Sequence, residues 1–76
     1  MEPSTAGETE VDDMFTVVVD PASEDAWING CTLIRVSGER YDARGRWVRV
    51  LVTKGRQVSD PLHINGDTPL ASFVRL

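Results

Sequence analysis

The chain of 76 residues has few of the side chains on which covalent cross-links and metal sites depend. It contains one cysteine, Cys31, and one histidine, His63. A single cysteine excludes an intramolecular disulfide, and one cysteine with one histidine cannot form a zinc-binding cluster. Stability must therefore come from packing, and at this length a hydrophobic core only just offsets the conformational entropy lost on folding. A homodimer would bury additional apolar surface.

Long apolar runs are also missing. No run approaches the roughly 20 residues that a transmembrane helix requires. The first residues are acidic and polar, without the basic start and apolar centre of a secretory signal. We therefore expect a soluble, cytoplasmic protein with no membrane partner. Met14 stands just before the first apolar segment, and the sequence leaves open whether it is an alternative start.

Basic residues are absent from the first 25 positions, which hold eight of the 12 carboxylates. All eight Lys and Arg residues follow, and seven of them lie between positions 35 and 56. Residues 1–13 have few large apolar groups, so they bury too little surface to offset the entropy lost on ordering. The sequence predicts a disordered acidic arm over 1–13 and a single small domain over 14–76.

The clearest element is the stretch 46–53, in which valines alternate with larger side chains. Val48, Val50 and Val52 would face one side, and Trp47 and Arg49 the other. β-branched residues at a period of two favour a half-buried strand over a helix. We interpret this stretch as a central strand with one buried, apolar face.

Other extended segments surround it. Residues 15–19 predict a first strand, and residues 31–43 predict a long arm that pairs with 46–53, with a bulge or turn at 37–38. Residues 57–64 predict a short strand at an edge, or one broken at Pro61, which cannot donate to a ladder. The expected fold class is α+β: a hairpin-rich, mainly antiparallel sheet of about four to five strands, open or barrel-like.

The C-terminal residues 69–76 allow two interpretations. Leu70, Phe73 and Val74 have the i, i+3, i+4 spacing of a one-faced helix, and Pro69 suits a first turn. A last strand is the alternative. We favour a short C-terminal helix, because it would cover the apolar part of the sheet's second face.

The tripeptide Ile-Asn-Gly occurs at 28–30 and again at 64–66, each time followed one residue later by Thr. Asn-Gly is the strongest short hairpin signal, because both residues tolerate positive φ. A duplicated hairpin and two independent turns both fit, and independent turns are the simpler explanation.

The sequence contains no motif that indicates an enzyme or a cofactor. His63 and Cys31 lack a recognisable nucleophile, base or cation beside them, and the glycines form no phosphate-binding loop. Asp20, Glu24 and Asp25 lack the ligand spacing of a calcium loop. We therefore expect a non-enzymatic protein with no metal and no cofactor.

The basic and aromatic stretch is the one feature that suggests a binding mechanism. The candidate binding residues are Arg35, Tyr41, Arg44, Arg46, Trp47 and Arg49. Arginine with tryptophan is a typical hot-spot composition for protein–protein contacts, and an exposed edge strand can pair with a partner or a second copy. The alternative is single-stranded nucleic-acid binding on the same face, with the acidic arm as competitor. A third interpretation is a solvated face without a ligand. The biological process and the partner's identity do not follow from the sequence.

Overall fold

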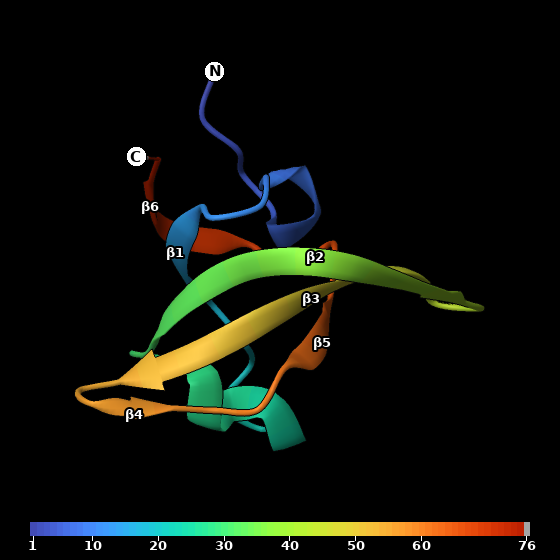
Figure 1. The fold of residues 1–76 in the computed structure, drawn as a ribbon. Helices are drawn as coiled ribbons and strands as arrows, with labels where there is room; N and C mark the ends of the chain where they lie inside the picture. Colours follow the sequence, from blue (N-terminus) through green and yellow to red (C-terminus); the bar gives the residue numbers. More distant parts are fainter. Residues whose placement is uncertain (76) are drawn as a thin grey trace.

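The computed structural model describes residues 1–75, whose regular elements are almost all β-strands (Figure 1). In chain order the elements are η1 (Ala6–Glu8), β1 (Met14–Val17), η2 (Glu24–Ile28), β2 (Thr32–Asp42), β3 (Gly45–Lys54), β4 (Gln57–Val58), β5 (Leu62–Asn65) and β6 (Leu70–Val74). The elements η1 and η2 are short 3-10 turns, so the described chain is an antiparallel β fold rather than α+β. None of the helices in residues 1–75 is long and apolar enough to cross a bilayer.

The long hairpin predicted from the valine alternation is formed by β2 and β3. All three valines of β3 are buried, whereas Arg49, between two of them, is exposed. The pairing register shifts between Arg35 and Glu39, which confirms an irregularity at the predicted positions 37–38. Alternation therefore identified both the strand and its buried face.

The strands form one sheet in the order β4-β3-β2-β1-β6, and β5 pairs with the edge of β3 that faces away from β2. Pro61 separates β4 from β5, as its missing donor predicted. Only residues 66–69 connect β5 to β6, although these strands stand near opposite ends of the strand order. The sheet must curl to bring them together, but no ladder among the described strands joins β5 to β6 to close a barrel.

The hydrophobic core lies inside this curl. Its largest fully buried side chains are Phe15, Ile28, Leu33, Val48 and Val50. In the view of Figure 1, η1 lies above the central hairpin and η2 lies below it. Each turn contributes one buried apolar residue, Ala6 from η1 and Ile28 from η2, so the two turns complete the core that the small sheet begins.

The N-terminal residues predicted to be disordered are instead packed against the sheet. Ala6 is 0% exposed and Asp13 only 3%. The N–H of Ala6 donates to the carbonyl of Thr68 (2.9 Å), and that of Gly7 donates to Gly66 (2.8 Å). Composition was misleading here because the segment needs no core of its own. Small side chains let its backbone approach the β5–β6 connection and bond to it.

The predicted C-terminal helix is wrong, because Leu70–Val74 form β6, which pairs with β1. Phe73 lies opposite the buried Phe15 and packs against the core. The helical spacing of the apolar residues was outweighed by backbone pairing, since β1 has an edge whose N–H and C=O groups need partners. As a result, no helix among the described residues covers the second face of the sheet.

The two Asn-Gly motifs lie in different settings, and neither closes a hairpin. Asn29 has a φ of −58° and connects η2 to β2, while its side chain accepts from the N–H of Val19 (2.8 Å) and donates to the carbonyl of Val19 (2.7 Å). Asn65 ends β5 and leads towards β6, a strand with which β5 does not pair. These settings favour independent turns over a duplicated hairpin.

Candidate functional site

Of the six predicted binding residues (Arg35, Tyr41, Arg44, Arg46, Trp47 and Arg49), all but Arg44 lie on one or the other face of the β2–β3 hairpin. Directly paired residues of antiparallel strands project to the same side. Arg35 pairs with Val50, so it lies on the buried, valine side, here called the inner face. Arg35 is only 5% exposed. It is therefore a structural residue rather than part of an open basic surface.

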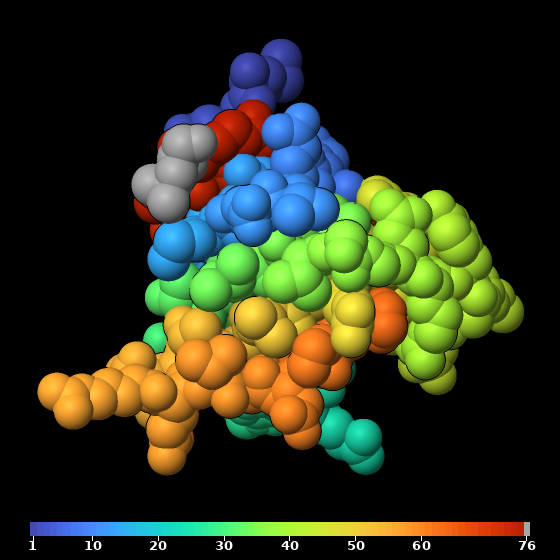
Figure 2. Space-filling view, viewed as in Figure 1, coloured from blue at the N-terminus to red at the C-terminus, as the bar shows by residue number. Residues whose placement is uncertain are grey.

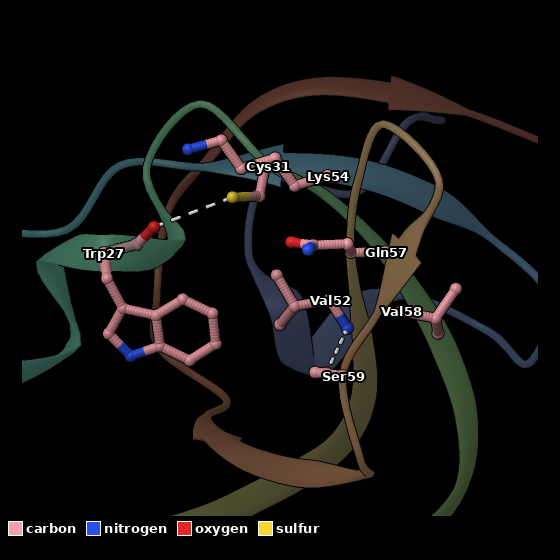
Figure 3. Close-up of a pocket in the computed structure, with 7 residues that line it drawn as sticks. All are labelled: Trp27, Cys31, Val52, Lys54, Gln57, Val58 and Ser59. Atoms are coloured by element: carbon pink, nitrogen blue, oxygen red, sulfur yellow. Dashed lines mark hydrogen bonds between the residues drawn. The ribbon is translucent and has the colours of Figure 1, made fainter.

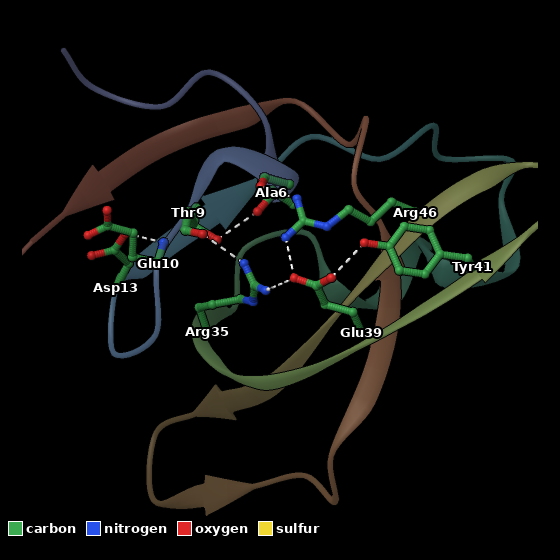
Figure 4. Close-up of polar contacts among 9 residues, drawn as sticks. Ala6, Thr9, Glu10, Asp13, Arg35, Glu39, Tyr41 and Arg46 are labelled. Atoms are coloured by element: carbon green, nitrogen blue, oxygen red, sulfur yellow. Dashed lines mark hydrogen bonds and ion pairs between the residues drawn. The ribbon is translucent and has the colours of Figure 1, made fainter.

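The inner-face residues gather around Glu39, as Figure 4 shows. Arg46 and Tyr41 are a cross-strand pair, and both bind the Glu39 carboxylate, the Tyr41 hydroxyl at 2.8 Å. Arg35 lies 3.5 Å from the same carboxylate and donates to the carbonyl of Thr9 at 2.7 Å. Two of the predicted arginines thus offset the charge of one carboxylate, and the Tyr41 hydroxyl donates a hydrogen bond to it.

The charges of this cluster shift the acid–base properties of its members. Hydrogen bonds from Arg46 and then Tyr41 lower the pKa of Glu39 to about 2, and the Glu39 carboxylate raises the pKa of Tyr41. Burial lowers the pKa of Arg35. Arg46 also donates to the carbonyl of Gly7 at 2.7 Å. The cluster therefore ties the N-terminal segment to the hairpin.

The outer face of the hairpin carries Trp47 and Arg49, which alternate with the buried valines. Arg40, which the sequence did not single out, pairs with Trp47 and holds its guanidinium 5.1 Å from the centre of the indole ring. The Arg49 side chain packs against Gly38: a Cβ added to Gly38 would lie 2.9 Å from the Cδ of Arg49. Arg44 lies in the turn between β2 and β3. The cationic surface that remains is thus smaller than predicted and includes a different arginine.

The outer face continues as an uncharged surface across four strands. Leu51 pairs with Ile34, Ile34 with Met14, and Met14 with Val74, so one aliphatic side chain from each strand forms a row. These four residues define the aliphatic row. The first three are half-buried and Val74 is 54% exposed. The row lies on the face that the predicted helix would have covered.

A row of hydroxyl groups runs beside the aliphatic row. Thr53 pairs with Thr32, and Thr16 pairs with Ser72, their hydroxyl oxygens 2.7 Å apart. Met14, Thr16, Thr32, Ser72 and Val74 also line a shallow hollow of about 180 Å³. An open sheet face of this composition is suited to contact, because it can be dehydrated without stripping water from a charge.

A separate groove of about 550 Å³ lies between η2 and the β3–β4 hairpin (Figure 3). Its lining residues are Trp27, Cys31, Val52, Lys54, Gln57, Val58 and Ser59. Cys31 and Val52 are buried, whereas the Trp27 side chain is 56% exposed. Sequence reasoning missed this groove because η2 and β4 come together only in the folded chain. A tryptophan directly after an acidic segment was the one signal in the sequence.

The residues considered for catalysis or metal binding have ordinary surroundings. The Cys31 thiol is buried and contacts the carbonyl of Trp27 at 3.6 Å. His63 is half-buried beside Arg49 in the β3–β5 ladder. Asp20 accepts the N–H of Ala22 at 2.9 Å in a local turn. Within residues 1–75, no group of three or more His, Cys, Asp or Glu side chains is arranged to hold a metal ion.

The candidate site is therefore a surface in two parts, the outer face with its aliphatic row and the groove beside η2. No protein-family model, curated protein or solved structure matches this chain.

Proposed function

We propose that the protein is a non-enzymatic interaction module that binds a protein partner through the outer face of its sheet. The single observation that carries this proposal is the aliphatic row from Leu51 to Val74, which no described helix covers. Uncovered apolar side chains that form a continuous surface are typical of docking sites.

The residues beside the aliphatic row strengthen the case for a protein ligand. Arg40, Trp47 and Arg49 supply the arginine and tryptophan side chains that dominate binding energy at protein interfaces. Neither arginine forms an ion pair with a carboxylate in residues 1–75. A partner with apolar residues opposite the row and carboxylates opposite the hairpin would complement both parts.

Two surface substitutions and a matched control test this proposal. The folded chain is used as bait, with Val74→Lys and Arg40→Glu as the outer-face variants and Val11→Lys as the control. Val11 is 52% exposed and Val74 54%, so the two lysines disturb similar environments. Proteins retained by the native chain and the control should be lost with both outer-face variants. The proposal fails if the same proteins bind equally to all four baits.

A second copy of the chain could occupy the same face as a homodimer. Sedimentation at increasing concentration measures this directly. A dimer that Val74→Lys dissociates and Val11→Lys leaves intact would identify the partner as the chain itself. A monomer at every concentration would leave only a different protein as the partner.

Single-stranded nucleic acid is the second candidate, favoured by the unpaired guanidinium groups of Arg40 and Arg49 beside an indole. Arg40 already covers the Trp47 ring, so a base could stack there only after Arg40 moved. Labelled single-stranded DNA and RNA at about 50 mM salt test this function under the conditions that favour it most. Absence of binding would exclude it, and binding that Arg49→Ala weakens would support it. The proposed competition by the N-terminal segment would also require that segment to leave the sheet.

A further inference from the structure

The groove beside η2 combines apolar walls with one cationic end. Figure 3 shows the Trp27 indole on one side and the 57–59 segment on the other, with Val52 between them. Lys54 lines one end. The volume of about 550 Å³ suits a large apolar side chain with its neighbours.

The wall formed by β4 offers backbone groups as well as side chains. The N–H of Ser59 donates to the carbonyl of Val52 at 2.8 Å. Because successive residues of a strand direct their N–H and C=O groups to opposite edges, those of Val58 point away from β3. The strand order ends at β4, so no described strand pairs with that edge. The Val58 side chain points away from Trp27 in Figure 3, so the groove meets Val58 mainly through its backbone.

The charges at this end of the sheet are unbalanced. Lys54 and Arg56 flank the turn between β3 and β4, and neither forms an ion pair within residues 1–75. Both side chains are exposed. A ligand carboxylate at this end of the sheet would be attracted electrostatically to Lys54 and Arg56.

From these three features we propose that the groove binds an extended segment of a partner protein, which adds as a strand to the free edge of β4. The segment places an aromatic or branched apolar side chain against Trp27 and a carboxylate near Lys54. Backbone bonds to Val58 provide affinity, and the groove and the lysine provide selectivity, as in other cases of strand addition. This site does not rest on the outer-face proposal, because the aliphatic row contributes nothing to it.

The probe for the test is a displayed library of random linear peptides of about eight residues, one strand in length. The library is selected on the folded full-length chain. We expect enriched peptides to share an apolar or aromatic residue with an acidic residue nearby. Their affinity for the native chain and for every variant is measured by the fluorescence polarisation of a dye-labelled peptide, a signal that does not depend on Trp27.

Paired variants separate backbone pairing from side-chain contact. Val58→Pro removes the outward N–H and should weaken the selected peptides about 3- to 10-fold relative to Val58→Ala, which keeps it. Trp27→Ala should weaken them more than about 10-fold. Lys54→Gln should weaken them at low salt and reduce the salt dependence of binding. Val74→Lys, on the other edge strand, should change nothing.

Three results would overturn the proposal. One is a selection with no enrichment over the unselected library. Another is a set of peptides that bind the Trp27→Ala and Lys54→Gln variants as well as the native chain, a comparison that holds even if Val58→Pro does not fold. The third is a dimer that forms without peptide and that Val58→Pro dissociates, because the occupant would then be a second copy.

Discussion

Replacing Ala6 by aspartate tests whether the acidic N-terminal segment is a structural part of the domain. Ala6 is 0% exposed, and its N–H is bonded to Thr68. A carboxylate in this position would be buried without a partner, which costs about 3–5 kcal/mol. A domain of this size is stabilised by only about 4–11 kcal/mol in total. Urea unfolding followed by circular dichroism should therefore show a loss of up to about 3–5 kcal/mol, and thermal unfolding a decrease in Tm of about 4–8 °C for each kcal/mol lost.

The matched control is Ala22→Asp, because Ala22 lies exposed in the loop before η2. The control should change the free energy of unfolding by less than about 0.5 kcal/mol. If detaching the N-terminal segment from the sheet costs less free energy than burying the carboxylate, the segment will detach. The decrease in the free energy of unfolding will then equal the free energy with which the segment packs on the sheet. The backbone amides of residues 6 and 7 will then exchange faster with solvent. Equal stability of the two variants would refute the packing of this segment and support the disordered arm that composition predicts.

Three further predictions concern the sheet and the Glu39 cluster. Val50→Ala should destabilise the fold by about 2 kcal/mol and Leu51→Ala by clearly less in urea unfolding, because only Val50 is fully buried; equal losses would contradict the assignment of faces. Glu39 has its pKa lowered from 4.5 to about 2, so its stabilising effect is present above pH 4.5 and disappears as the pH falls towards 2. The difference in stability between the native chain and Glu39→Gln should therefore shrink over that range, and a constant difference would contradict the ion pair with Arg46. Gly66→Ala should cost about 1–3 kcal/mol in thermal unfolding, because its Cβ would lie 2.9 Å from the Arg46 carbonyl oxygen; an unchanged Tm would refute that close approach.

Alternation within one strand was enough to predict only part of the candidate site. Alternation correctly separated Val48 and Val50 from Trp47 and Arg49, because a strand turns successive side chains to opposite faces. It did not specify how β2 aligns with β3. A shift of one residue would move Arg35 to the other face, so its burial could not be derived from its own strand.

The local sequence did not predict that the outer face of the sheet stays uncovered. The apolar spacing of Leu70, Phe73 and Val74 fits a helix as well as a strand, and local propensity does not decide between them. The tertiary structure decides, because as a strand this segment pairs with the open edge of β1 and packs Phe73 against the core. Once β6 takes that place, the cover expected for the second face is gone and the aliphatic row stays open.

The central hairpin was predictable from the sequence, as were its buried valine face, the irregularity in β2 and the break at Pro61. Each of these follows from the shape or the hydrogen-bonding groups of residues close together in the chain. Three other features could be found only in the folded chain: residues 4–13 pack against the sheet, residues 70–74 form a strand, and Trp27 faces β4 across a groove. These features depend on contacts between distant segments, whose energies arise only when the sheet curls and brings its two ends together.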